Sequence, residues 1–230
     1  MFLPGGFLSG DLLPWILLAP SVPILAALIR RPSFTPSSIS LLICTVVPLL
    51  TGIFGFLSSD KELNRAVLHF TIFLDASCAF LLLYIHSHWR KLQQLVMTLG
   101  LIFAGIFITL MLFGDEGLGL SVLIKAGYTL IFLGALAVII SHMQHISQYI
   151  TVSPAFWISA GICFQYGLMG LLLVMNPHDD PARLLSYPDF GIMYTVIYVL
   201  RFLFFSIAVF LYKPLEYREK KDSRDRRRPL

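Results

Sequence analysis

Charged residues are scarce in this sequence, and their scarcity excludes most soluble folds. Only 13% of the 230 residues are Asp, Glu, Lys or Arg, whereas 57% are hydrophobic. A soluble domain usually has about a quarter of its residues charged, because its surface has to be hydrated. The apolar residues here come in blocks, each long enough to cross roughly 30 Å of hydrocarbon. The composition therefore predicts a membrane protein whose first partner is the lipid bilayer.

Cysteine is also rare, and its positions exclude a disulfide framework. The three cysteines, Cys44, Cys78 and Cys163, all fall inside apolar blocks. Disulfide-stabilised domains carry an even number of cysteines on exposed loops. We therefore expect these three to be small packing residues.

A charged leader is missing at the start of the sequence. Residues 1–10 contain no Lys or Arg, whereas a secretory signal begins with a positively charged stretch. We expect the first apolar block to be a retained helix.

Motifs typical of enzymes are absent too. The sequence contains no phosphate-binding loop and no nucleophile elbow. A single acidic residue, Asp75, lies within the predicted spans, so no pair of carboxylates is available there for acid–base chemistry. A retinal Schiff base would need an amine on the last helix, where the sequence has Arg201, whose guanidinium stays protonated. We predict a non-enzymatic protein without a cofactor or metal.

Seven apolar blocks predict seven membrane-spanning helices. Each block has about 18–23 residues, which fits a helix that rises 1.5 Å per residue across the hydrocarbon. The blocks are approximately Leu12–Ile29, Ile39–Leu57, Val67–His86, Leu95–Phe113, Leu118–Ile140, Ala155–Met175 and Ile192–Tyr212. The predicted fold is an all-α polytopic bundle over residues 1–213, followed by a basic tail over residues 214–230.

The distribution of basic residues predicts the orientation of this bundle. Twelve Lys or Arg fall on one side of the predicted membrane, namely Arg30, Arg31, Arg90, Lys91 and eight residues from Lys213 to Arg228. Three fall on the other side, namely Lys61, Arg65 and Arg183. Because loops rich in Lys and Arg stay in the cytoplasm, we predict a multi-pass inner-membrane protein with its N-terminus outside and its C-terminal tail in the cytoplasm.

The tail itself has two possible roles. Lys and Arg next to a membrane attract anionic lipid by roughly 1 kcal/mol each, so the tail can anchor the topology, or it can dock a protein partner. Nucleic-acid binding is not expected, because no aromatic platform accompanies the charges.

Polar residues inside the predicted spans are the candidate site. Asp75, Lys125 and Arg201 lie about 12, 10 and 14 Å below the outer boundary at 1.5 Å per residue, and Gln165 lies at mid-span. An unpaired charge at this depth costs several kcal/mol. We therefore predict that Asp75 pairs with Lys125 inside the bundle, with Arg201 and Gln165 close by.

Tyrosines share helical faces with the two predicted cations. Tyr194 and Tyr198 precede Arg201 at helical spacing, and Tyr128 follows Lys125. The surplus positive charge of the cluster has to be met by a tyrosine, a carbonyl, water or an anionic ligand, and Tyr194 and Tyr198 are the nearest candidates. Three interpretations stay open: a network that fixes helix packing, a ligand pocket or proton path, and snorkelling of Lys125 to the lipid surface.

Part of the sequence resembles a known group of proteins. The sixth predicted helix opens with Pro154-Ala155-Phe156-Trp157-Ile158-Ser159-Ala160-Gly161, and an aromatic-rich run from Tyr194 to Lys213 ends the last one. These segments resemble uncharacterised seven-helix inner-membrane proteins of Bacteroidota. Such proteins are similar to the membrane sensor halves of histidine kinases, without the kinase. The resemblance implies signalling and carries no catalytic residues.

Three functions follow as hypotheses. The leading one is a non-enzymatic membrane module, either a sensor-like signalling protein or a subunit of a larger complex, with a protein partner in the membrane or at the tail and an unknown ligand. The main alternative is a small-solute or proton carrier that uses Asp75, Lys125 and Arg201. A haem-binding electron carrier is the third, and it would need the four histidines near the inner helix ends to converge. These are His86, His88, His142 and His145.

Overall fold

The chain folds into helices alone wherever its structure is described. The computed structural model describes residues 18–31, 35–57, 61–113, 118–145, 150–175 and 188–212. Within these ranges it contains seven α-helices, one short 3-10 turn and no strand. The elements are α2 (Ser21–Arg30), α3 (Pro36–Leu57), α4 (Lys61–His86), α5 (Arg90–Phe113), α6 (Leu118–His145), η1 (Ile150–Val152), α7 (Pro154–Met175) and α9 (Pro188–Leu211).

Each predicted apolar block overlaps one of these helices, but several helices extend past the predicted ends. α4 begins at Lys61 rather than Val67, and α6 continues to His145. These extensions are more polar than the blocks, so an apolar criterion misses them. α2 begins at Ser21, directly after Pro20, because proline fits the start of a helix. α2 is therefore shorter than its block. The rest of that block, before Leu18, and the tail lie outside the described residues.

Five of the helices are long and apolar enough to cross a membrane. Their apolar stretches are His69–His86, Arg90–Leu112, Val122–Gln144, Pro154–Val174 and Ile192–Leu211. α2 and the first part of α3 are shorter apolar helices. Helices of this length and composition are typical of a multi-pass membrane protein, because each can satisfy its own backbone hydrogen bonds across the hydrocarbon.

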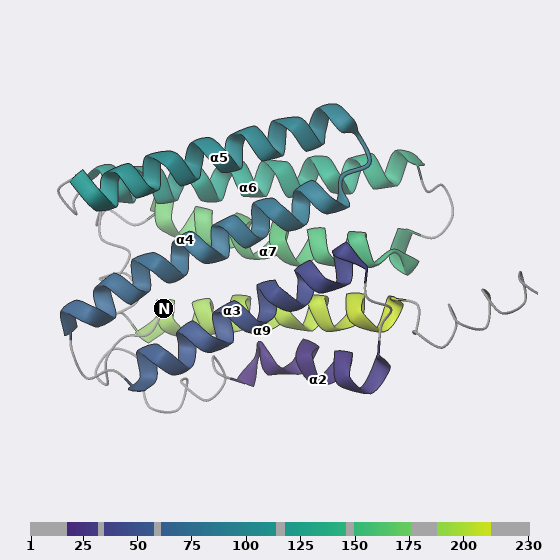
Figure 1. Ribbon diagram of the computed structural model, residues 1–230, viewed down its shortest axis with the longest axis horizontal. Coiled ribbons are helices and arrows are strands. Elements are labelled where there is room, and N and C mark those ends of the chain that lie inside the picture. Colours follow the sequence, from purple (N-terminus) through teal and green to yellow (C-terminus); the bar gives the residue numbers. More distant parts are fainter. Residues whose placement is uncertain are drawn as a thin grey trace, which may run out of the picture.

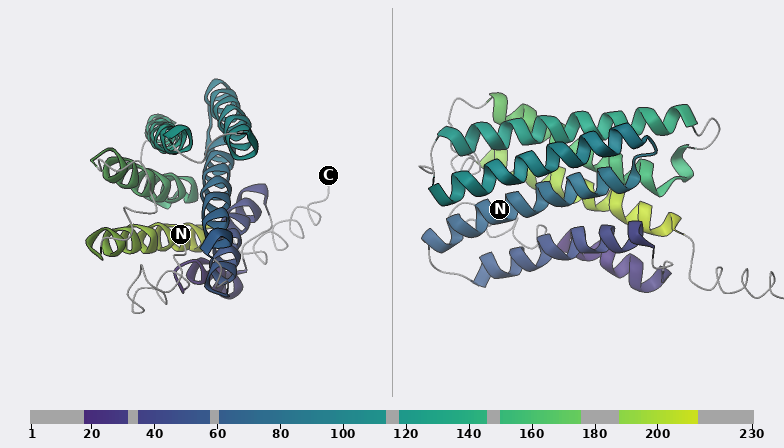
Figure 2. Two further views of the ribbon diagram at one scale, coloured as in Figure 1. Left: turned by 90° about the vertical axis from the view of Figure 1, so that its left-hand side faces the viewer. Right: turned by 45° about the horizontal axis from the view of Figure 1, so that its top comes forward.

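The helices run up and down in one bundle with α4 at its centre (Figures 1 and 2). α4 packs against α3, α5, α6 and α7, and α9 packs against α7 and α2. α5 lies at the edge, where only 17% of its apolar stretch is buried, compared with 50% for those of α4, α7 and α9. Residues on α4, α7 and α9 are therefore the ones that the bundle encloses.

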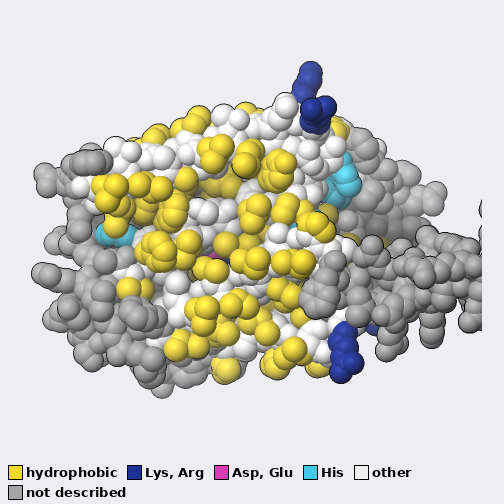
Figure 3. Space-filling view, viewed as in Figure 1, with side chains coloured by type: hydrophobic (Ala, Val, Ile, Leu, Met, Phe, Trp, Pro, Cys, Tyr) yellow, Lys and Arg dark blue, Asp and Glu magenta, His cyan; other side chains and the backbone are white. Residues whose placement is uncertain are grey.

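The outer surface of the bundle is apolar along its length and basic at one end. Figure 3 shows hydrophobic side chains over the middle of the visible face and Lys and Arg side chains at its right-hand end. Arg30 and Arg31 at the end of α2, and Arg90 and Lys91 at the start of α5, are exposed. Figure 1 places both helix ends at this same end of the bundle, which we call the basic end.

Candidate functional site

The central feature of the interior is an ion pair between α4 and α9. The Arg201 Nη1 atom lies 2.7 Å from Asp75 Oδ1 and 2.8 Å from Asp75 Oδ2. The Arg201 side chain has no exposed surface, and that of Asp75 is 15% exposed. Removing two charges from water is costly unless they pair with good geometry and additional hydrogen bonds. The neighbours of this pair supply those bonds.

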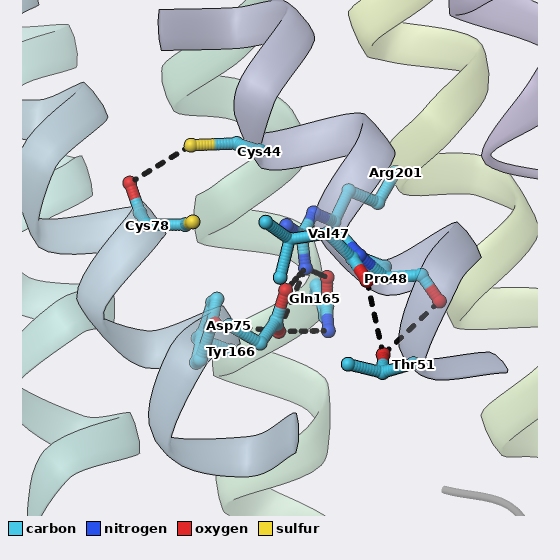
Figure 4. Close-up of polar contacts among 9 residues, drawn as sticks. All are labelled: Cys44, Val47, Pro48, Thr51, Asp75, Cys78, Gln165, Tyr166 and Arg201. Carbon is cyan, nitrogen blue, oxygen red and sulfur yellow. Dashed lines mark hydrogen bonds and ion pairs between the residues drawn. The ribbon is translucent and has the colours of Figure 1, made fainter. Parts of the chain in front are cut away.

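Two consecutive residues of α7 complete the pair (Figure 4). The Tyr166 hydroxyl donates to Asp75 Oδ2 at 2.8 Å, and Gln165 Nε2 lies 3.5 Å from the same oxygen. Gln165 Oε1 accepts from Arg201 Nη1 at 2.6 Å. The four side chains, here called the Asp75 network, connect α4, α7 and α9.

A glycine brings α7 close enough to α9 for these bonds. A Cβ atom at Gly161 would lie 3.1 Å from the Phe204 Cβ atom and 3.3 Å from the Arg201 carbonyl oxygen. Small residues of this kind let helices in membranes approach closely. Gly161 lies four residues before Gln165, on the same helical face, so the close approach also presents Gln165 to Arg201.

The rest of the Arg201 guanidinium lies among aromatic rings. Its Cζ atom is 5.2 Å from the ring centroid of Phe202 and 5.1 Å from that of Phe205, within the range of cation–π attraction. In the described part of the chain, its buried Nε and Nη2 atoms have no hydrogen-bond partner. The carboxylate and Gln165 therefore hold Nη1, while rings rather than oxygen atoms surround the remainder.

The predicted pairing of Asp75 with Lys125 is wrong, because Arg201 is the cation bonded to Asp75. Among the described residues, the ion pair of Asp75 is with Arg201, and Lys125 has interactions of its own. Lys125 is half-buried, and its helical neighbours Val122, Ala126 and Thr129 are exposed. The side chain thus lies on the outward face of α6. The Asp75 network consequently has one charge of each sign rather than a surplus positive charge.

The three predicted tyrosines form part of an aromatic shell around the network. Tyr128 packs edge-on against Tyr166 with centroids 4.9 Å apart, and the stacked rings of Tyr194 and Tyr198 are 5.6 Å apart. All three are buried. Among the described residues, no hydrogen bond joins Tyr194 or Tyr198 to Arg201, whose hydrogen-bond partners are Asp75 and Gln165.

Sequence reasoning missed Tyr166, which bonds the carboxylate directly. Its signal in the sequence is its position beside Gln165 in an otherwise apolar run, because a buried tyrosine hydroxyl usually needs a hydrogen-bond partner. The missed residue supplies the shortest bond from α7 to Asp75.

A second polar cluster joins three helices at the basic end. The Ser37 hydroxyl lies 2.6 Å from His86 Nε2 and also hydrogen-bonds the Tyr212 hydroxyl. The Tyr212 hydroxyl is 3.2 Å from His86 Nε2. His86 Nδ1 lies 2.8 Å from the Leu82 carbonyl oxygen, so Nδ1 carries the proton and Nε2 accepts. Burial raises the pKa of Tyr212, which keeps this hydroxyl neutral.

Some of the inner histidines come together near this cluster. The rings of His88 and His142 have centroids 4.4 Å apart, and both interact electrostatically with His86. The side chain of His145 lies outside the described residues. Within the described ranges, no group of three His, Cys, Asp or Glu side chains is placed to hold a metal ion.

Comparison with protein-family models, with characterised proteins and with solved structures finds no match to this chain.

Proposed function

We propose that this chain is a non-enzymatic, multi-pass inner-membrane protein that acts as a sensor-like signalling module or as a subunit of a larger membrane complex. The observation that carries the proposal is the Asp75 network, because it connects three helices through charges enclosed by apolar side chains. A buried ion pair tolerates few alternative geometries. A signal that moves α4 relative to α9 can therefore act on this ion pair, which is either formed or broken.

The proposed topology has seven crossings, the N-terminus outside and the tail in the cytoplasm. Support comes from the basic end, where Arg30, Arg31, Arg90 and Lys91 are exposed at the ends of α2 and α5, because positive residues mark the cytoplasmic side. A reporter fused after Arg228 is expected to be active in the cytoplasm, and one inserted between Asp179 and Ser186 outside. A cytoplasmic signal from the second reporter would overturn the topology.

The proposed partner is a protein that docks at the membrane or at the tail. This follows the resemblance to sensor modules and the basic tail at residues 214–230. The test is purification in mild detergent of the full chain and of a chain ending at Lys213. We expect a stoichiometric protein to accompany the full chain. Its loss from the shortened chain assigns the contact to the tail, and its retention assigns it to the bundle. Purification of the full chain alone would contradict the proposal.

A carrier of protons or small solutes is the second candidate, and one observation favours it. Within the part of the chain that the structure describes, Arg201 has two buried groups, Nε and Nη2, without a hydrogen-bond partner, and the planar guanidinium suits bidentate binding of a carboxylate. Proteoliposomes with an internal pH-sensitive dye test proton transport. Transport that Asp75→Asn abolishes and Lys125→Met leaves intact would support a carrier. An inert wild-type protein would remove proton transport from consideration.

A further inference from the structure

An exposed apolar face of α2 ends in two arginines. Val22, Leu25 and Ile29 follow i, i+3, i+7 spacing and share one side of the helix, and all three are exposed. We call these three residues the α2 stripe. Arg30 and Arg31 come directly after it, and both of their side chains are exposed as well. The end of α2 therefore presents apolar surface and positive charge next to each other.

The opposite face of α2 holds the helix to the bundle through small side chains. α2 packs against α9 and α3, and Figure 1 shows it at the outside of the bundle. Its buried residues are Pro23 and Ala26, which bring little apolar area into the contact. α2 has only ten residues, too few to cross the hydrocarbon. Its attachment therefore depends on whatever covers the α2 stripe.

The charge at the end of α2 favours an anionic ligand. Residues 12–59 contain no Asp or Glu, so no acidic residue close in the sequence balances Arg30 and Arg31. A guanidinium presents a planar fork of N–H donors that matches two oxygen atoms of a phosphate. Lys and Arg at a membrane surface attract anionic lipid. A phosphate group is thus the ligand chemistry that this pair fits.

Arg31 has a backbone conformation that glycine adopts at lower cost. Its φ and ψ angles are 47° and 62°, in the left-handed region, and its amide N–H donates to the Ala27 carbonyl oxygen at 2.8 Å. Gly or Asn usually occupies such a position at the end of a helix. Among the residues that the structure describes, no other non-glycine residue has a positive φ. The chain therefore carries a cation where the backbone geometry favours glycine.

We propose that the end of α2 binds one anionic phospholipid. The headgroup phosphate lies against Arg30 and Arg31, and an acyl chain covers the α2 stripe. A free phosphate ion has the same headgroup chemistry but no chain, so only the lipid uses both features of the surface. The bound lipid holds α2 against α9, the helix that carries Arg201. This site goes beyond the proposed function, because it needs no protein partner.

The direct test is a lipid titration of the full chain in detergent, followed by native mass spectrometry. The probes are phosphatidylglycerol, which is anionic, phosphatidylcholine, which has no net charge, and glycerol phosphate, which has no acyl chains. An arginine at the surface contributes roughly a fivefold gain in affinity, so we expect phosphatidylglycerol to bind about 25-fold more tightly than phosphatidylcholine. Equal affinities for the two lipids would overturn the proposal. Displacement of the lipid by an equal concentration of glycerol phosphate would show a free-phosphate site and overturn it too.

Two double variants remove equal charge at the basic end and provide a matched control. Arg30→Gln/Arg31→Gln is expected to weaken phosphatidylglycerol binding about 25-fold and to leave phosphatidylcholine binding unchanged. Arg90→Gln/Lys91→Gln removes two charges from α5, which packs against α4 and α6, and should weaken binding by no more than about threefold. The basic tail is present in both variants, so its own attraction for anionic lipid does not distinguish them. Equal losses would show a diffuse surface effect and overturn the site.

A single variant separates lipid binding from the stability of α2. Arg31→Gly removes one charge and suits the left-handed backbone, so the lipid-free protein is expected to unfold at the wild-type temperature or above it. The same variant is expected to bind phosphatidylglycerol about fivefold more weakly. Unchanged binding would overturn the role of Arg31. Recovery of a protein partner plays no part in these measurements, so failure of the lipid site is distinguishable from failure of the proposed function.

Discussion

The bundle contains two polar clusters built from different chemistry. The Asp75 network uses full charges at the centre of the bundle, with Arg201 completely enclosed. The cluster of Ser37, His86 and Tyr212 uses hydroxyls and an imidazole at the basic end. Water can replace neutral hydrogen bonds at a helix end, but it cannot easily reach an ion pair among apolar helices. The central cluster should therefore specify the packing of the bundle, whereas the end cluster should only restrain its rim.

The largest expected effect is that of removing the carboxylate. Asp75→Ala leaves the Arg201 charge buried without a partner, which is expected to lower the free energy of unfolding by about 3–5 kcal/mol. The measurement is reversible unfolding in mixed detergent micelles. The double variant Asp75→Leu/Arg201→Met removes both charges and should recover most of this loss. A single variant as stable as the wild type would contradict a structural ion pair.

Loss of the tyrosine hydroxyl is expected to have the next largest effect. Tyr166→Phe keeps the ring and removes one donor to the Asp75 carboxylate, which should cost about 1–2 kcal/mol in the same unfolding measurement. Tyr128→Phe is the matched control, because its ring packs against Tyr166 and no hydrogen bond joins it to Asp75 in the described part of the chain. Equal losses for the two variants would assign no special role to the Tyr166 hydroxyl.

A smaller and more local effect is expected at the basic end. Ser37→Ala removes the hydroxyl that bonds both His86 and Tyr212, and water can occupy part of its place, so the loss should be about 1 kcal/mol or less. Hydrogen exchange should quicken at the start of α3 and the end of α9 and stay unchanged around Asp75. Faster exchange at the centre of the bundle would show that the two clusters are not independent.

The smallest effect is expected for Lys125. Lys125→Met should change the free energy of unfolding less than the substitutions above, because the residue lies on the outward face of α6 and outside the Asp75 network. Arg201→Met leaves Asp75 uncompensated and should cost several times more. Comparable losses for the two variants would mean that Lys125 also supports the interior.

The sequence predicts the helices well because each apolar block has to span the same thickness of hydrocarbon. It also predicts that Asp75, Gln165 and Arg201 come together, since all three lie at one depth. Depth alone does not tell which way a side chain points around its helix. Lys125 lies at the same depth as Asp75 and faces outward, whereas Arg201 faces inward. The partner of Asp75 could therefore be predicted only from the packing of whole helices.

The omission of Tyr166 has a related cause. Tyrosine is common in apolar helices and carries no charge, so its position beside Gln165 indicates a need for a hydrogen-bond partner but not that the partner is a carboxylate. Its role depends on the close approach of α7 at Gly161, where a Cβ atom would lie 3.3 Å from a backbone oxygen of α9. A glycine within a span indicates a close helix contact, but not which helix is the partner.

The most direct test of the account is a pair of double-mutant cycles that share Asp75. One cycle combines Asp75→Asn with Arg201→Met, and the other combines Asp75→Asn with Lys125→Met, with the free energy of unfolding as the readout. Residues in direct contact show coupling energies of about 0.5–3 kcal/mol, and separated residues add to within about 0.5 kcal/mol. The account predicts strong coupling to Arg201 and additivity with Lys125. Coupling to Lys125 as strong as that to Arg201 would contradict it.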